Sequence, residues 1–132
     1  INLNTDTIDS FVSKKAIKKI NYIKCDVEGF DLEVIKGAKK SFDNEIIDFF
    51  QFEYNHRWIN NKAFLKDVFY FLDKTNYKVG KICSNKVKVI SSWHPELEKF
   101  NETNYVIINQ NFLKHDFCYN VKFNRYNVMV YE

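Results

Sequence analysis

The stretch at residues 22–30 reads YIKCDVEGF and passes from an apolar run into a short acidic segment. Its first four residues, 22–25, are typical of a short β-strand. The carboxylates of Asp26 and Glu28 follow the strand, and Gly29 comes directly after them. From position 27 to position 42 apolar residues recur at helical spacing, which predicts an amphipathic helix. The stretch therefore predicts a strand that leads straight into a helix, the unit from which α/β proteins are built.

The flanking segments continue this alternation. Thr5, Asp6 and Thr7 offer N-cap side chains for a short helix, which we expect to end at Asn21. Residues 46–54 are almost continuously apolar or aromatic, as in a strand buried on both faces of a parallel sheet. A second helix is predicted over residues 64–72, with Asn60 or Asn61 as its cap and Asn76 closing it.

The C-terminal part is rich in strands and poor in helical patterns. Strands are predicted over residues 77–83, 86–90 and 105–108, and a weak hairpin over 121–123 and 128–130. Strands without intervening helices pair antiparallel, because a short connection reverses the chain. The predicted fold is thus an α/β sheet with antiparallel terminal strands. We expect one domain portion over residues 1–110 and a C-terminal extension over 111–132.

Composition narrows the class of protein. Hydrophobic residues make up 45% and aromatic residues 17% of the 132 positions, which is too much apolar content for a disordered chain. The net charge of +3 lacks the clustered basic stripe of a nucleic-acid binder, so a nucleic-acid partner is not expected. Three cysteines without a CxxC pair disfavour structural zinc and fit free thiols in a reducing compartment, the cytoplasm. No apolar run is long enough to cross a membrane, so no membrane partner is expected.

Polar residues gather where two predicted strands end. Asp26 and Glu28 follow the first strand, while Glu53 lies at the end of the next one and His56 follows it. If these strands are neighbours, the carboxylates share the sheet edge at which α/β proteins bind ligands. Carboxylates placed there can bind hydroxyls, act as a base or hold Mg²⁺. The alternative is that Asp26 caps the following helix and Glu28 stabilises its first turn.

Longer matches lead to a known family. Residues 22–40, YIKCDVEGFDLEVIKGAKK, resemble the K-x-D-V-E-G-x-E-x-x-V-L-x-G-A signature of FkbM methyltransferases. Residues 7–11 are similar to the T-L-D-S-F that precedes that signature, and residues 52–58 to its F-E-Y-N…W strand end. Further similarities at 72–77 and 104–106 keep the order of the family, so the resemblance spans about Asn4 to Ile108.

This resemblance implies a fold and an activity. The fold would be the C-terminal portion of a Rossmann-like class I methyltransferase sheet, with our strands as its fourth through seventh. The activity would be methyl transfer from S-adenosylmethionine to a hydroxyl of a sugar, another glycan acceptor or a small molecule. The family's glycine-rich cofactor loop is not found in this sequence, so the chain would supply the acceptor-side half.

Roles follow for the residues at the two strand ends. We expect Asp26, Glu53 and His56 to be catalytic, and Asp26, Glu28 and Gly29 to contact the cofactor. The alternative is a non-catalytic interaction module or a pseudoenzyme fragment. The first strand of a half-sheet would also present an unpaired edge, so we expect self-association or a missing N-terminal segment of the same protein.

Overall fold

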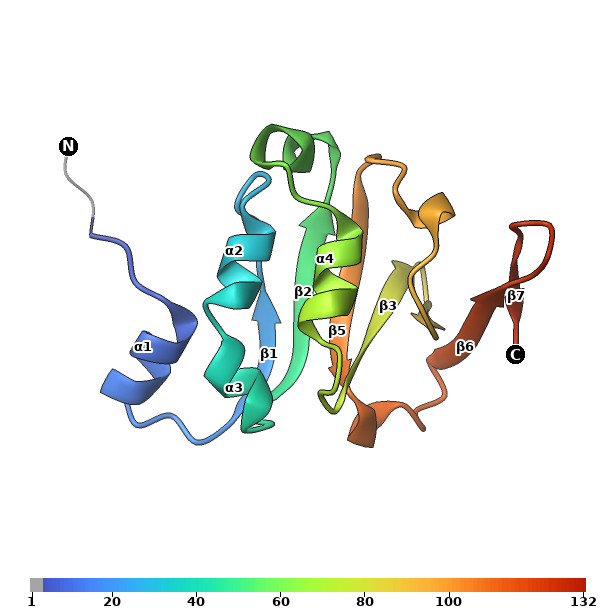
Figure 1. The fold of residues 1–132 in the computed structure, drawn as a ribbon. Helices are drawn as coiled ribbons and strands as arrows, with labels where there is room; N and C mark the ends of the chain where they lie inside the picture. Colours follow the sequence, from blue (N-terminus) through green and yellow to red (C-terminus); the bar gives the residue numbers. More distant parts are fainter. Residues whose placement is uncertain (1–3) are drawn as a thin grey trace.

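A computed structural model describes residues 4–132 and shows a mixed sheet of seven strands with helices in front of it (Figure 1). The strand order is β1-β2-β5-β3-β4-β6-β7. Helices α2, α3 and α4 cover one face over β1, β2 and β5, whereas β6 and β7 extend beyond them. The mixed α/β class expected from the sequence is therefore correct.

The first two strands are parallel neighbours, which meets the condition that the sequence analysis set for a shared edge. β1 (Ile20–Lys24) runs beside β2 (Ile47–Tyr54), with Lys24 opposite Gln51. The ladder continues for one more bond, from the Cys25 amide to the Gln51 carbonyl at 2.8 Å. Since the two strands are parallel neighbours, their carboxyl ends open at the same edge of the sheet.

The remaining strands pair mostly antiparallel, as expected. β5 (Thr103–Asn109) lies between β2 and β3 (Tyr77–Cys83), and β3 also pairs with β4 (Lys86–Ile90). The predicted hairpin is confirmed as β6 (Cys118–Phe123) and β7 (Met129–Tyr131). The exception is β6 beside β4, a parallel pair, because the chain passes through β5 before it returns.

Helix α1 (Ile8–Lys14) is shorter than predicted and does not reach Asn21. Ala16 takes a left-handed conformation with φ 52°, and the Ile17 amide bonds back to the Val12 carbonyl at 3.0 Å. This wrapped turn satisfies the last carbonyls and ends the helix. Asn21 lies within β1 instead.

The continuous helix predicted over residues 27–42 is also wrong. Residues 26–30 form a turn, and the helix is split into α2 (Asp31–Lys36) and α3 (Lys39–Asp43). The break comes from α1, because the Asp9 carboxylate accepts the amides of Lys40 at 2.8 Å and Ser41 at 2.9 Å. A side chain from another helix thus caps α3 at its first turn.

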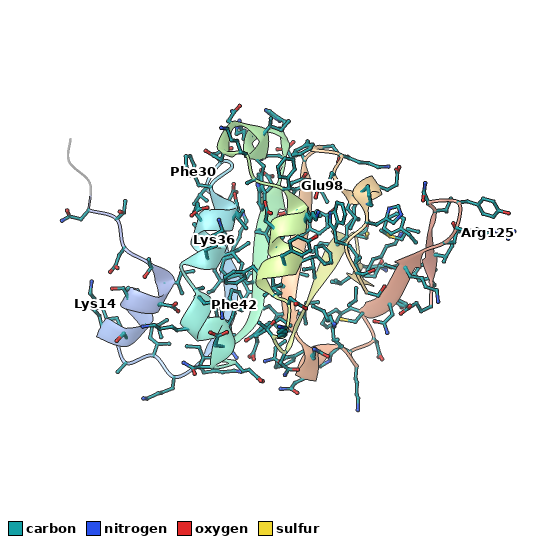
Figure 2. The ribbon with its side chains drawn as sticks, in the orientation of Figure 1. Lys14, Phe30, Lys36, Phe42, Glu98 and Arg125 are labelled. Carbon is teal, nitrogen blue, oxygen red and sulfur yellow. The ribbon has the colours of Figure 1, made fainter. Side chains whose placement is uncertain are left out.

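Helix α4 (Leu65–Phe71) is capped differently from the prediction. Asn60 and Asn61 belong to the 3₁₀ segment η1 (His56–Asn61), not to the start of α4. Instead, the Glu98 carboxylate accepts the amides of Leu65 and Lys66, at 3.1 and 2.8 Å. Glu98 follows the 3₁₀ turn η2 (Pro95–Leu97) and lies 33 positions after Leu65 in the sequence (Figure 2).

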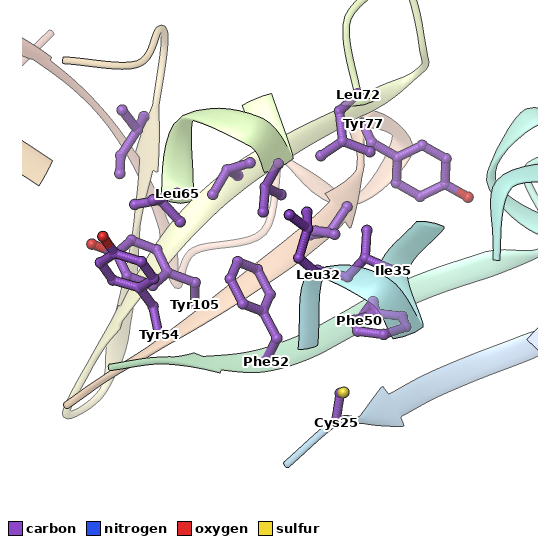
Figure 3. Packing of buried hydrophobic residues seen from close by; sticks show 14 of the residues in the cluster. Cys25, Leu32, Ile35, Phe50, Phe52, Tyr54, Leu65, Leu72, Tyr77 and Tyr105 are labelled. Carbon is purple, nitrogen blue, oxygen red and sulfur yellow. The ribbon is translucent and has the colours of Figure 1, made fainter. Parts of the chain in front are cut away.

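The main core lies between the helices and the sheet (Figure 3). Phe50, Phe52 and Tyr54 of β2 point into it and are at most 1% exposed. The alternate residues of β2 face the other side, where a smaller cluster forms around Val106 and Ile108 and packs against η3 (Gln110–Phe112). This smaller cluster covers β2 only in part, so β2 is fully buried on its helix-facing side but only partly buried on the other. The prediction of a strand buried on both faces is therefore correct for the helix-facing side only.

Candidate functional site

The acidic turn after β1, residues 26–30, has unusual backbone geometry. Asp26 follows the strand, Glu28 has φ 56°, and Gly29 has φ 99°. A Cβ added to Gly29 would lie 2.8 Å from the Cβ of Arg57 in η1. Gly29 is therefore required by the close approach of η1 and by its own backbone conformation.

The end of β2 is fixed by a local hydrogen-bond network. The Asn55 side chain is 1% exposed and donates to the Glu53 carboxylate at 2.6 Å. The same side chain accepts the Arg57 amide at 2.9 Å, which starts η1. The buried Trp58 ring donates its Nε1–H to the Glu53 carbonyl at 2.9 Å, so its role is packing and positioning.

The predicted site residues share one edge but do not bond to one another. The register that sets Lys24 opposite Gln51 places Asp26 level with Glu53, one residue past the ladder. Asp26 pairs with Lys24 at 3.3 Å, and Glu28 pairs with Arg57. Within residues 4–132, no hydrogen bond joins Asp26 to Glu53, and His56 is exposed at the start of η1.

A divalent cation is not favoured by this arrangement. Among the described residues, no group of three or more His, Cys, Asp or Glu side chains is placed to hold a metal ion. Asp26, Glu28 and Glu53 each engage a different partner, so the sequence-based alternative of Mg²⁺ held by all three has no support in the geometry. Half-exposed carboxylates such as Asp26 instead suit hydrogen bonds from a hydroxyl or an ammonium group.

Asp31 belongs to this edge, although the sequence did not single it out. Its carboxylate is 1% exposed, and one oxygen accepts the Glu53 amide at 3.4 Å. The other oxygen has no hydrogen-bond partner in the part of the chain that the structure describes. Burial, together with the neighbouring Asp31, raises the pKa of the Cys25 thiol well above its usual range, so this thiol stays protonated.

The contacts of Asp31 and Arg57 could not be read from spacing. A carboxylate in the first turn of a helix is an ordinary stabilising feature, and that is how Asp31 appears in the sequence. Arg57 contacts Glu28 across 29 positions, through a 3₁₀ turn that the apolar pattern does not reveal. Asp31 is recognised as part of the edge only by its burial, and Arg57 only by its approach to Gly29.

Comparison with known proteins identifies the family. A family model described as the methyltransferase FkbM domain matches residues 1–79, a segment that contains β1, β2 and the acidic turn. This chain belongs to the FkbM methyltransferase family. Neither the curated proteins nor the solved structures gave a match to it. Among residues 4–132, every helix is too short or too polar to span a bilayer.

Proposed function

We propose that this chain supplies the acceptor-side half of a methyltransferase that uses S-adenosylmethionine and methylates a hydroxyl oxygen of a sugar or small molecule. The match of residues 1–79 to the FkbM domain carries this proposal, because it includes the acidic turn and the end of β2. In the Rossmann-like sheet implied by the resemblance, β1, β2, β3 and β5 would be the fourth through seventh strands. A cytoplasmic location fits the free thiols of Cys25, Cys83 and Cys118.

The edge residues fit the cofactor in part. Asp26 has a half-exposed carboxylate that suits the hydroxyl or ammonium groups of the cofactor, and Glu28 offers a second one beside Arg57. The Gly29 carbonyl already accepts from the Asn61 amide at 2.9 Å, and Arg57 fills the space where a Gly29 Cβ would lie. We therefore assign the cofactor-facing role to Asp26 first and to Glu28 second, and limit Gly29 to shaping the turn.

The bound cofactor would supply an electrophilic methyl group. The residues of this chain would orient the acceptor hydroxyl and take its proton as the oxygen attacks. Alignment of this kind can contribute roughly 7–11 kcal/mol to catalysis. Asp26 is the first candidate to accept the proton, since its side chain is 50% exposed and it is less buried than Glu53. Glu53 comes next, as a base or an acceptor ligand, and His56 follows on the same turn.

A non-catalytic interaction module is the rival function. One observation favours it: Asp26, Glu28 and Glu53 are each already engaged, by Lys24, Arg57 and Asn55. Calorimetric titration with S-adenosylmethionine, on this chain and on any longer product of the same gene, separates the two. Heat of binding supports the enzyme, whereas no binding to either polypeptide supports the module.

Turnover in a complete domain tests the residue roles. Asp26→Asn and Glu53→Gln should each lower kcat, by on the order of 10²–10⁴-fold where the carboxylate acts as the base. Asp43→Asn is the matched control, because it removes a surface carboxylate of α3 that pairs with Lys39 away from the edge. Unchanged turnover in both edge variants would rule out the proposed roles.

A further inference from the structure

A row of lysine and tyrosine side chains crosses the sheet on its helix-bearing face. The strand registers place Tyr105 of β5 opposite Lys81 of β3, Lys81 opposite Lys88 of β4, and Lys88 opposite Tyr119 of β6. Tyr105 also lies opposite Phe52, which points into the core beneath the helices. We call Lys81, Lys86, Lys88, Tyr119 and Tyr131 the lysine–tyrosine row.

The positive charge in this row is not neutralised. Lys81 and Lys88 face each other directly across an antiparallel ladder, a placement that costs stability. Within residues 4–132, no carboxylate lies within 4.0 Å of either ammonium group or of Lys86. The two like charges repel each other, and an anion bound between them would remove that repulsion.

Aromatic rings lie close to the ammonium groups of Lys86 and Lys88. Lys86 Nζ lies 5.0 Å from the ring centroid of Tyr119 and 5.7 Å from that of Tyr131. Lys88 Nζ lies 5.7 Å from the Tyr131 centroid. Both rings are exposed, Tyr119 by 42% and Tyr131 by 54%. The row therefore combines charge with flat apolar surface, on which sugar rings pack.

A cleft of about 310 Å³ adjoins the row at Lys81. Its polar lining includes Asn101, Asn127, Glu96 and the phenol of Tyr105. Burial raises the pKa of Tyr105 to about 12, so its hydroxyl stays protonated and can donate. That hydroxyl makes no hydrogen bond to another residue in the described part of the chain, which leaves it available to a ligand.

We infer that the cleft and the lysine–tyrosine row bind an acidic saccharide, a chain of sugar rings that carries carboxylate groups. Amides, a phenol and the single carboxylate of Glu96 suit sugar hydroxyls, while Lys81 and Lys88 suit the carboxylates. Glu96 is itself paired with Lys99, another residue of the lining, at 3.6 Å, so it does not cancel the charge of Lys81. The cleft and the row draw all their residues from the chain after position 79, where the family match ends.

The position of the cleft connects it with the proposed function, on which this choice of ligand rests as an acceptor. Tyr105 faces Phe52, the residue before Glu53, and Lys81 is the next residue along the row. Neighbouring strands are about 4.8 Å apart, so Lys81 lies roughly 10 Å from β2. Glu53, the next residue of β2, faces the opposite side of the sheet, so an oligosaccharide seated in the cleft would reach it only around the carboxyl end of β2.

Binding of defined oligosaccharides to this chain tests the inference. A galacturonate oligomer should bind, and a neutral glucose oligomer of equal length should bind about ten-fold more weakly or not at all. Lys81→Gln with Lys88→Gln, and separately Tyr105→Phe, should weaken galacturonate binding by about ten-fold. Lys39→Gln is the matched control, because that lysine pairs with Asp43 on α3, and it should leave binding unchanged.

The outcomes separate this inference from the proposed methyl transfer. Equal affinity for the neutral oligomer, no loss in the cleft variants, or tighter binding of a uridylate oligomer would overturn it. Asp43→Asn should leave galacturonate binding intact, since Asp43 lies on α3, outside the cleft. Binding without methyl transfer would keep the saccharide surface and reject the proposed enzyme, whereas transfer without binding would do the reverse.

Discussion

Gly29 and Arg57 are in contact through backbone and Cβ atoms, because Gly29 has no side chain of its own. An added Cβ would lie 2.8 Å from the Arg57 Cβ and 3.0 Å from its carbonyl. This contact brings η1 against the acidic turn, and the Asn61 amide reinforces it by donating to the Gly29 carbonyl at 2.9 Å. The shape of the candidate site therefore depends on one glycine as much as on its carboxylates.

Gly29→Ala should destabilise the protein by about 2 kcal/mol or more, because φ 99° strains any side-chain residue and the methyl group meets backbone. Urea unfolding measures this loss. Gly37→Ala is the control, since that glycine has an ordinary φ of −68° and its added Cβ would find no atom closer than 3.3 Å. Equal losses in the two variants would show that the contact with Arg57 does not constrain the turn.

The strands were easier to predict than the helix ends. Residues 77–83 and 86–90 were predicted as strands and are β3 and β4 with the same bounds, because alternation and turn residues are local signals. The split between α2 and α3 depends on Asp9, which bonds to an amide 31 positions away, and the start of α4 depends on Glu98. Such caps come from the tertiary fold, and no local window contains them.

The candidate site, like the fold, could be predicted from the sequence only in part. The sequence placed Asp26 beside Glu53 on condition that their strands are neighbours, and the parallel pairing of β1 with β2 meets that condition. The burial of Asp31 and the pairing of Glu28 with Arg57 did not follow, because both depend on where η1 folds back. The roles assigned to Asp26, Glu53 and His56 stay predictions until turnover is measured.

Glu98→Ala should cost about 2–4 kcal/mol, since the Glu98 carboxylate accepts from four donors at the junction of β2, α4 and the η2 segment. The donors are the Tyr54 hydroxyl, the Trp93 indole and the first two amides of α4. Urea unfolding and the near-ultraviolet signal of the aromatic residues report the loss. Glu102→Ala, an exposed carboxylate in the following loop, should change stability little. A similar small effect at Glu98 would contradict its capping role.

Asp6 should titrate well below an ordinary aspartate. Its hydrogen bond from Lys14, at 2.7 Å, and then one involving Ser10 lower the pKa of Asp6 to about 2. An aspartate in the unfolded chain titrates near 3.9. Because the folded value is the lower one, the contribution of Asp6 to stability is present above about pH 4 and is lost as pH falls towards 2. Carboxyl NMR titration measures the pKa, and Lys14→Gln should raise it towards the unfolded value; an unchanged pKa in that variant would exclude the Lys14 bond as its cause.

Strand β1 should mediate self-association at high protein concentration. Among residues 4–132, β1 pairs only with β2, so its outer edge has unpaired backbone groups. Tyr22 lies in the middle of β1, is 53% exposed, and its hydroxyl donates to the Gln51 side chain of β2. Light scattering should show a mass that rises with concentration, and Tyr22→Lys should suppress it by placing charge on the edge. Tyr126→Lys, at a residue 67% exposed in the β6–β7 turn, adds the same charge elsewhere and should leave association unchanged. A constant monomer mass would mean that the side chains of β1 protect its edge, and equal suppression by both variants would point to net charge instead of strand pairing.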